Sequence, residues 1–368
     1  MNSEKAKKKQ IEITVIGCGI AGITTAFHLG KKGYKVNLID PKVNSEINNL
    51  NPQNGTQAAL GVLMGNIYKR SKGRAFLLRN KSIKLWKEWL LELDNYELDL
   101  KMEKPLIKLA SSEKEYQSMI EISKNKKENG IKLLDKNSIE FWNSIFDKKL
   151  IGGLISLEDG RLNPIKLIKL LMKSLDKLMV NKIEDNVIKI NKNINSLNKI
   201  WKIYLESNQC INQDYIVICS ALSTQKLIKP LGHSILLEPI LGQVFELELE
   251  QETSDWNKWP AVLNYQSINF IHHNSNHIIM GATLENNTAP SLSHKKDMLY
   301  MNNTAPDWIK QSKVINEWYG IRAKPKNEPA PILKELDQGL FINTGHYRNG
   351  ILLAPSCAEW IGKKINNQ

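Results

Sequence analysis

The sequence predicts an α/β fold of two domains, one built on a parallel sheet and the other on an antiparallel sheet. Near the start, the apolar run 11–16 is typical of a buried parallel strand, and it leads through a glycine-rich turn into a helical pattern. Later in the chain, the strand patterns 243–249, 269–271 and 277–283 are joined by polar turns, as in antiparallel hairpins. The length of 368 residues also exceeds what one hydrophobic core usually serves, so two domains are expected.

The glycine-rich turn has the spacing of a dinucleotide-binding loop. Gly17 permits a tight turn, Gly19 lets the backbone approach a pyrophosphate, and Gly22 lets the helix pack closely on the strand. The helix would point its N-terminus and its free N–H groups at the phosphates. A second strand at 35–39 ends in Asp40, 18 residues after Gly22, where a carboxylate is expected to bind the adenosine ribose. We therefore predict a Rossmann-like domain, with loop contacts from Gly17, Gly19, Ile20, Ala21 and Gly22.

The positive charge of the chain does not by itself indicate nucleic acid. The formal net charge is +13, but only six of the 51 basic residues are arginine. Such a lysine-rich bias is typical of AT-rich codon usage, whereas a surface that evolved to bind phosphate favours arginine forks. Nucleic acid is therefore a disfavoured partner, although the charge does not exclude it.

No segment of the sequence indicates a membrane, a metal or a disulfide. No apolar run reaches transmembrane length, and residues 1–10, which we expect to form a flexible tail, lack the apolar stretch of a signal peptide. The four cysteines have no C-x-x-C spacing, and His272, His273 and His277 have no acidic cluster beside them. We expect a cytoplasmic protein without a metal site. Hydrolase and nucleoside-triphosphatase motifs do not occur.

A run of small residues at 55–65 would let the backbone pass closely against a flat ring. A helix-packing seam is the alternative interpretation of the same pattern. Short strands are expected at 187–190 and 214–219, and the second ends in small residues that suit close passage beside a dinucleotide. We expect dinucleotide contacts in these segments from Thr56, Ala58, Ala59, Gly61, Val62, Val187 and Ala221.

The helices expected in the first half of the chain serve mainly as packing elements. The segment 76–93 is amphipathic, so its tryptophans belong to the core. Residues 111–150 mix charged stretches with isolated apolar positions and indicate exposed helices. Another helix begins at Pro164 and runs to residue 178.

The C-terminal segment carries the most specific motif. A strand ends at 318–322, a second strand spans 340–344, and a helix spans 351–365. Between the second strand and the helix, and running into that helix, stands Gly345-His-Tyr-Arg-Asn-Gly-Ile-Leu-Leu-Ala-Pro355. Together with the glycine-rich turn near the start, this segment suggests a flavoenzyme.

Taken together, these motifs resemble the D-amino-acid oxidase family of FAD enzymes. Within that family, the glycine oxidase branch linked to thiamine synthesis is the most similar. The resemblance covers nearly the whole chain in order. It rests on the glycine-rich start, the small-residue run, and the segments 158–164, 280–283, 318–322 and 345–355.

The resemblance implies a discontinuous FAD domain and a substrate domain whose antiparallel sheet covers the flavin. The expected FAD domain comprises 11–85, 150–235 and 318–368, and the expected substrate domain comprises 86–149 and 236–317. FAD is expected to bind noncovalently, because the cysteine that carries the flavin in sarcosine oxidases has no counterpart here. The implied FAD contacts of the last motif are Gly345, His346, Tyr347, Arg348, Asn349, Gly350, Ile351 and Leu352.

The resemblance also assigns chemical roles. Arg322 would clamp the substrate carboxylate, Arg348 would lie beside it, and the helix from Asn349 would point its positive end at the flavin N1 and C2 carbonyl. A neutral amine, once oriented, transfers hydride from its α-carbon to flavin N5. The implied reaction is oxidation of glycine or a related N-substituted small amino acid to an imine. Hydrolysis then gives a 2-oxo acid, and dioxygen is expected to become hydrogen peroxide.

Two positions depart from the family pattern. The family places a tyrosine near the substrate at the position of Asn269 or Phe270, and neither residue has a phenol. Tyr265 is the candidate to replace it. The usual glycine after the strand 214–219 is Ala221 here.

Two other functions remain open at this point. One is removal of a carboxymethyl group from a modified tRNA wobble uridine. The reacting unit of that uridine is also an N-substituted glycine. The other is a flavin-bearing assembly protein without turnover, against which the retained Arg322 and Arg348 argue. The sequence leaves open the true amine, the choice between oxidase and dehydrogenase, and whether the protein forms a homo-oligomer.

Overall fold

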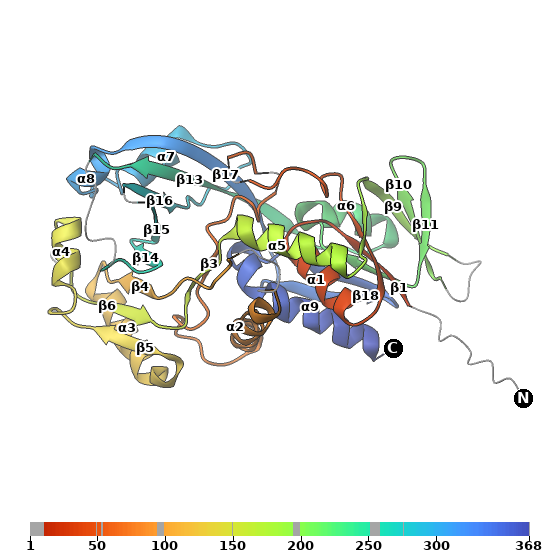
Figure 1. The fold of residues 1–368 in the computed structure, drawn as a ribbon, viewed down its shortest axis with the longest axis horizontal. Helices are drawn as coiled ribbons and strands as arrows, with labels where there is room; N and C mark the ends of the chain where they lie inside the picture. Colours follow the sequence, from red (N-terminus) through yellow and green to blue (C-terminus); the bar gives the residue numbers. More distant parts are fainter. Residues whose placement is uncertain are drawn as a thin grey trace, which may run out of the picture.

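The molecule is built on two large sheets, with helices packed on them (Figure 1). The computed structural model describes residues 11–48, 50–52, 54–93, 99–148, 150–193, 199–250, 258–274 and 276–367. The expected tail at 1–10 lies outside these residues. The mixed α/β class is confirmed, with a parallel core in one sheet and mainly antiparallel pairing in the other.

The first sheet has six strands in the order β18-β19-β12-β1-β2-β8. Its pairs are parallel except for the hairpin of β18 and β19. Alternate residues of the central strands enter separate hydrophobic clusters, so both faces are covered, as a parallel sheet requires. The strands are β1 (Glu12–Ile16), β2 (Lys35–Ile39), β8 (Asn181–Ile183), β12 (Tyr215–Ile218), β18 (Ile332–Asp337) and β19 (Leu340–Thr344).

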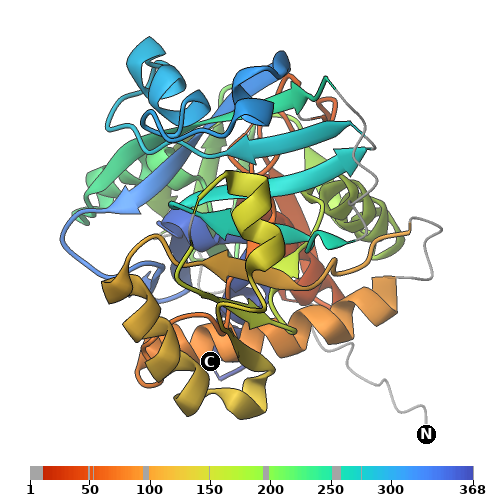
Figure 2. The same cartoon turned by 90° about the vertical axis from the view of Figure 1, so that its left-hand side faces the viewer.

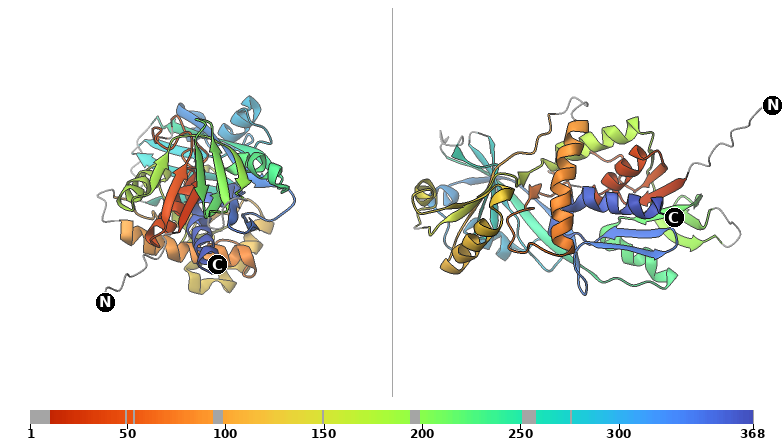
Figure 3. Two further views of the ribbon diagram at one scale, coloured as in Figure 1. Left: turned by 90° about the vertical axis from the view of Figure 1, so that its right-hand side faces the viewer. Right: turned by 90° about the horizontal axis from the view of Figure 1, so that it is seen from below.

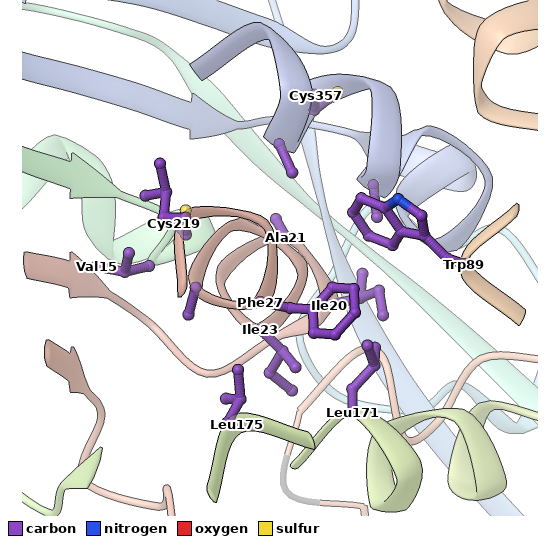
Figure 4. Close-up of a cluster of buried hydrophobic side chains, with 14 of the residues drawn as sticks. Val15, Ile20, Ala21, Ile23, Phe27, Trp89, Leu171, Leu175, Cys219 and Cys357 are labelled. Carbon is purple, nitrogen blue, oxygen red and sulfur yellow. The ribbon is translucent and has the colours of Figure 1, made fainter. Parts of the chain in front are cut away.

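Helix α1 (Ile20–Lys31) lies at the centre of the cluster on one face of this sheet. Side chains of the sheet and of three other helices point toward it in Figure 4, among them Val15, Trp89, Leu171 and Cys357. The long α2 crosses α9 beside it (Figure 3). The three helices are α2 (Arg74–Leu93), α5 (Pro164–Lys177) and α9 (Gly350–Asn366).

The opposite face of the six-stranded sheet is covered by a small antiparallel sheet and the short α6 (Thr224–Ile228). The small sheet has the order β11-β10-β9. Its strands are β9 (Val187–Lys192), β10 (Trp201–Leu205) and β11 (Cys210–Gln213). The sequence predicts β9 but not the hairpin of β10 and β11.

The second sheet has eight strands in the order β17-β13-β16-β15-β14-β4-β6-β5. All its pairs are antiparallel except β14 with β4. Helix α4 (Glu140–Phe146) lies over one face of this sheet in the view of Figure 2. Its Trp142 and Phe146 belong to the hydrophobic cluster on that face. The strands are β4 (Leu106–Leu109), β5 (Ile131–Leu134), β6 (Gly153–Ser156), β13 (Leu237–Glu248), β14 (Val262–Tyr265), β15 (Ile268–Asn274), β16 (His277–Gly281) and β17 (Lys313–Pro325).

The sheets do not divide at the residues expected from the sequence. β6 and the second half of β17 belong to the eight-stranded sheet, although their residues were assigned to FAD-domain segments. β17 continues to Pro325 because it pairs with β13 along its whole length, from Lys313 opposite Glu248 to Pro325 opposite Leu237. The division of the chain into two domains stays a prediction.

The segment 111–150 is not wholly helical. α3 (Glu113–Asn125) and α4 are present, but β5 lies between them and pairs with β6. Gly130, with φ of +71°, turns the chain into β5. The chain also forms two short helices, α7 (Leu292–Leu299) and α8 (Asp307–Lys310). A two-stranded sheet pairs β3 (Val62–Leu63) with β7 (Gly160–Arg161).

The small-residue run joins the two large sheets. The indole Nε1 of Trp318, on β17, donates to the carbonyl of Ala58 at 3.1 Å. A Cβ added to Gly320 would lie 2.6 Å from the Cβ of Ala58, and one added to Gly55 would lie 2.8 Å from the carbonyl oxygen of Ile321. The start of the run is therefore a packing seam against a strand, whereas Gly65 at its end lies against Ile83 of α2, and the run also forms part of a cavity wall.

Candidate active site

A cavity of about 510 Å³ lies where the carboxyl ends of the parallel strands meet one face of the eight-stranded sheet. This is the edge of an open α/β sheet at which ligands bind. Its walls come from several parts of the chain that are distant in sequence. They include the glycine-rich loop, the end of β2 with Asp40, the small-residue run, the end of β12 with the following turn, the middle of β13 and β17, and the segment 343–351.

The glycine-rich loop has the geometry that its sequence predicts. Gly17 has φ of +106°, and its amide donates to the carbonyl of Ile39 at 2.8 Å. A Cβ at Gly22 would lie 1.8 Å from the carbonyl oxygen of Gly17, so any side chain there would push α1 off the strand. A Cβ added at Gly19 would lie 3.6 Å from its nearest neighbour, Oγ1 of Thr56, so the backbone of Gly19 is open to the cavity.

The N-terminus of α1 is partly occupied by the protein itself. The amide of Ile20 donates to Oγ1 of Thr56 at 3.0 Å. This bond ties the small-residue run to the loop and uses one of the N–H groups that the sequence assigned to phosphate. Ile20, Ala21 and Thr56 nevertheless all line the cavity.

Asp40 is fixed at the cavity wall by two backbone groups. The amide of Cys18 donates to Oδ2 and the amide of Lys42 donates to Oδ1, both at 2.8 Å. A carboxylate has about four lone-pair sites, so each oxygen keeps an acceptor for a ribose hydroxyl. Burial, followed by the charge of Asp40, raises the pKa of the Cys18 thiol to about 12, so this thiol stays protonated.

The C-terminal motif forms the opposite wall. Gly345 and Tyr347 have φ of +65° and +53°, which places a tight turn immediately before α9. Two polar atoms of this wall, Nε2 of His346 and Oδ1 of Asn343, are buried and have no hydrogen-bond partner among the described residues. Unpaired buried polar atoms are costly, so these atoms fit a wall that is completed by a polar ligand.

A dinucleotide fits this set of residues. The open Gly19, the anchored Asp40 and the two unpaired atoms lie on walls of one cavity, next to the N-termini of both α1 and α9. Helix N-termini favour phosphate and other negative charge. Of the residues predicted to contact the cofactor, most line the cavity: Gly17, Gly19, Ile20, Ala21, Asp40, Thr56, Ala58, Ala59, Gly61, Val62, Val187, Ala221, Gly345, His346, Tyr347, Arg348, Asn349, Gly350 and Ile351.

Two predicted contacts do not lie on the cavity wall. Gly22 packs against Gly17, and Leu352 is fully buried in the helical cluster around α1. Their backbones shape the site from behind. Ala221 does line the cavity and has φ of +48°, a conformation that favours glycine, which explains why a glycine is usual there.

Arg322 enters the cavity from β17. Its Nη1 donates to the carbonyl of Thr283 at 3.2 Å. A Cβ at Gly242 would lie 2.2 Å from a guanidinium nitrogen of Arg322, so the neighbouring strand needs a glycine at this point. Burial, followed by the charge of Arg348, lowers the pKa of Arg322 to about 10, which leaves it protonated at neutral pH.

Arg348 lines the same cavity, from the turn before α9. Among the described residues, neither Arg322 nor Arg348 forms an ion pair with a carboxylate. The charge of Glu285 does act on Arg322, but the carboxylate of Glu285 already accepts hydrogen bonds from Gln243, Thr283 and Ser291. Two adjacent guanidinium groups without an acidic partner make an anion site.

Tyr265 does not lie at this site, so we withdraw it as a candidate. In the register of β14 and β15 it stands opposite Ile268, on the face that packs against α4. Its ring centroid is 4.7 Å from that of Phe146. Because side chains alternate along a strand, the neighbouring Asn269 faces the cavity, and its Oδ1 accepts from Asn264 at 2.9 Å.

The sequence analysis missed Tyr68, which lines the cavity from the loop between β3 and α2. Nothing in its neighbourhood of lysine, arginine and serine singled it out. In the parts of the chain that the structure describes, no cluster of three or more histidine, cysteine and acidic side chains could hold a metal ion. Of the helices described, none is both long enough and apolar enough to cross a bilayer.

Comparison with known proteins shows the family of the chain. Residues 12–364 match the model of a family described as FAD dependent oxidoreductase, named DAO after its D-amino-acid oxidase members. The chain belongs to this family. It is a FAD-dependent oxidoreductase, and the residues that line the cavity fit the FAD that the family uses.

Known relatives within the family are distant in sequence. A glycine oxidase of Bacillus licheniformis is 22% identical over 369 residues, covering 97% of this chain and 94% of the relative. The crystal structure of a glycine oxidase from Geobacillus kaustophilus superposes with a TM-score of 0.81 at 20% identity, covering 98% of this chain and 96% of that one. The crystal structure of an iminodiacetate oxidase from Chelativorans sp. BNC1 also superposes with a TM-score of 0.81. It is 18% identical, and the match covers 97% of this chain and 95% of that one.

Proposed function

We propose that the protein oxidises glycine or a closely related N-substituted small amino acid. The amine becomes an imine, which hydrolyses to a 2-oxo acid, and dioxygen is reduced to hydrogen peroxide. For glycine itself, the balance is glycine, dioxygen and water giving glyoxylate, ammonia and hydrogen peroxide. The names of the similar proteins, glycine oxidases and an iminodiacetate oxidase, support this substrate class.

The proposal rests mainly on the surroundings of Arg322. A guanidinium that is largely buried and has no carboxylate partner among the described residues is costly for the fold unless a ligand supplies the anion. The carboxylate of an amino acid matches the guanidinium fork in two parallel hydrogen bonds. One Arg322 nitrogen already donates to Thr283, so the orientation of the fork is set before substrate arrives.

The paired charges also favour the reactive form of the substrate. Arg322 and Arg348 stabilise a carboxylate beside them and disfavour an ammonium group, so they lower the pKa of the bound amine. The neutral amine that results can release electrons from its α-carbon without a separate general base. When bound, FAD supplies the two-electron acceptor for that carbon. The protein's own contribution is to orient the substrate and to keep its amine deprotonated.

The cysteines bear on how the cofactor is held and on where the protein works. We propose that FAD is held noncovalently, because Cys18, Cys219 and Cys357 are buried with pKa values raised to about 12 and are poor nucleophiles. The free cysteines of the described chain fit a reducing cytoplasm. The glycine oxidase resemblance extends the proposal to thiamine synthesis.

The proposal is tested by product identification. Purified protein is mixed with glycine, sarcosine, iminodiacetate and D-alanine, in air and with an artificial electron acceptor. We expect the 2-oxo acid, with ammonia or the matching amine, from glycine or from at least one of the N-substituted glycines, and hydrogen peroxide in air. If no free amino acid is consumed with either acceptor, the proposal is wrong.

A further inference from the structure

The loop between β3 and α2 brings a phenol into the active-site cavity. Within this loop, Met64 and Tyr68 line the cavity. Tyr68 is 36% exposed, and among the described residues its hydroxyl forms no hydrogen bond. The roof of the cavity offers the amide of Asn269 instead of a phenol, and that amide is already bonded to Asn264.

A buried carboxylate holds one side of this loop. Asp159 is fully buried and accepts from the amides of Gly65, Asn66 and Ile67 at 2.8, 3.0 and 3.0 Å. It also accepts from the side-chain amide of Asn66 at 3.1 Å. A carboxylate that accepts this many hydrogen bonds tolerates burial and fixes the backbone that donates them.

A buried amine holds the other side. Lys126 is 3% exposed and follows α3 directly. Its Nζ donates to the carbonyl of Asn66 at 3.0 Å and to the carbonyls of Tyr68 and Arg70. The loop that carries Tyr68 is therefore held by two buried ions of opposite sign, Asp159 just before Tyr68 and Lys126 at its own carbonyl, which come from segments far away in the sequence.

The ring of Tyr68 is fixed as well. The guanidinium carbon of Arg79, on α2, lies 4.6 Å from its centroid. Arg79 is itself buried, its Nε has no hydrogen-bond partner, and it forms no ion pair among the described residues, so the ring is its principal neighbour of opposite polarity. On the cavity side, the positive charge of Arg348 reaches the phenol and opposes the rise in its pKa that burial causes.

The contacts of Asp159, Lys126 and Arg79 restrain this loop more than is usual for a loop at the protein surface. The backbone carbonyl and the ring have fixed contacts, whereas the hydroxyl has no hydrogen-bond partner among the described residues; Tyr68 lines the cavity, and the charge of Arg348 acts on its phenol. A phenol that stays protonated donates a hydrogen bond, and the cavity is arranged for a carboxylate acceptor.

We propose that Tyr68 contacts the substrate and donates its phenolic hydrogen to the carboxylate held by Arg322 and Arg348. This inference rests on the proposed function. Tyr68 would complete the carboxylate site from the wall opposite the eight-stranded sheet, and the site would then select small α-carboxylates by three donors. Arg79 is the positioning residue, because it acts through the ring.

The test uses Tyr68→Phe in the FAD-loaded protein. Phenylalanine keeps the ring under Arg79 and the backbone contacts, and removes only the hydroxyl. Glycolate serves as the probe, because it presents the carboxylate of glycine without an amine to oxidise. Its dissociation constant is measured by the change in flavin absorbance. Tyr300→Phe, which removes an exposed hydroxyl outside the cavity, is the matched control.

We expect Tyr68→Phe to weaken glycolate binding about 10- to 100-fold, the usual effect of one hydrogen bond to a charged group. The KM for the amino acid should rise by a similar factor, while FAD content, melting temperature and the Tyr300→Phe control stay unchanged. Equal glycolate binding by wild type and Tyr68→Phe would overturn the role of Tyr68 but would leave the proposed function standing. If the wild type binds neither glycolate nor any small carboxylate, the proposed function fails, and the inference fails with it.

Discussion

Replacement of Arg322 by alanine gives the sharpest separation between a catalytic and a structural role. The side chain reaches the cavity across Gly242, with one nitrogen donating to Thr283 and no ion pair among the described residues. If the fork grips the substrate carboxylate, Arg322→Ala removes two charge-assisted hydrogen bonds. If the residue instead served to hold elements together, the variant would lose stability.

The structure sets the expected magnitudes. Hydrogen bonds to charged groups contribute about 1.5–3 kcal/mol each, so two bonds correspond to about 3–6 kcal/mol, or about 10²- to 10⁴-fold in kcat/KM. Stability should behave differently. The folded-state pKa of about 10 lies below the usual value of 12.5, so at neutral pH the charged Arg322 opposes folding. Its loss should leave the melting temperature unchanged or raise it.

The assay compares steady-state turnover, flavin content and thermal unfolding for three variants. Arg322→Lys should recover only part of the activity, because a point charge cannot form the bidentate contact. Arg74→Ala, which removes an exposed arginine at the start of α2, is the control and should behave as wild type. Normal saturation of Arg322→Ala by an amino acid, or a fall in melting temperature with turnover retained, would refute the reasoning.

Three further outcomes follow from single residues of the cofactor site. Asp40→Ala should weaken FAD retention, measured as flavin lost on dialysis, because it removes the acceptor for two backbone amides and for the ribose; unchanged retention would place the ribose elsewhere. Gly22→Ala should yield protein without flavin, judged by absorbance, because its Cβ would lie 1.8 Å from the Gly17 carbonyl oxygen; a fully yellow variant would contradict the close packing. Burial lowers the pKa of His346 to about 4 from 6.5, so between these values the unfolded chain binds more protons and stability falls as pH falls, by up to about 3 kcal/mol. Denaturant unfolding of the apoprotein from about pH 7 to about pH 4 should show a weaker pH dependence for His346→Asn, and equal slopes would contradict this.

The strand, turn and helix around the glycine-rich loop could be predicted from the sequence because they are local, whereas their role in binding the cofactor stays a prediction. A strand, a glycine-rich turn, a helix and a strand ending in Asp40 follow one another directly, and each carries its own periodicity. The C-terminal motif is equally compact. In both places the conformation depends on a few neighbouring residues, chiefly glycines, so the pattern specifies the geometry.

The substrate side could not be predicted in the same way, because it depends on contacts between distant segments. Whether Tyr265 or Asn269 faces the cavity is decided by the register of β14 on β15, which periodicity does not fix. Tyr68 enters the cavity only because Asp159 and Lys126, from elsewhere in the chain, hold its loop. Short strands such as β5 and β11 were missed for a related reason, since pairing rather than pattern stabilises them.

The central claim is that a free small amino acid, held by its carboxylate, reduces the flavin. The most direct measurement is anaerobic mixing of the purified yellow protein with glycine, sarcosine or iminodiacetate, followed by flavin absorbance. We expect bleaching by at least one of them without RNA and with little dependence on salt, because only one small anion is bound. No bleaching by any amino acid, together with reduction by undermodified tRNA that weakens steeply with salt, would contradict the account.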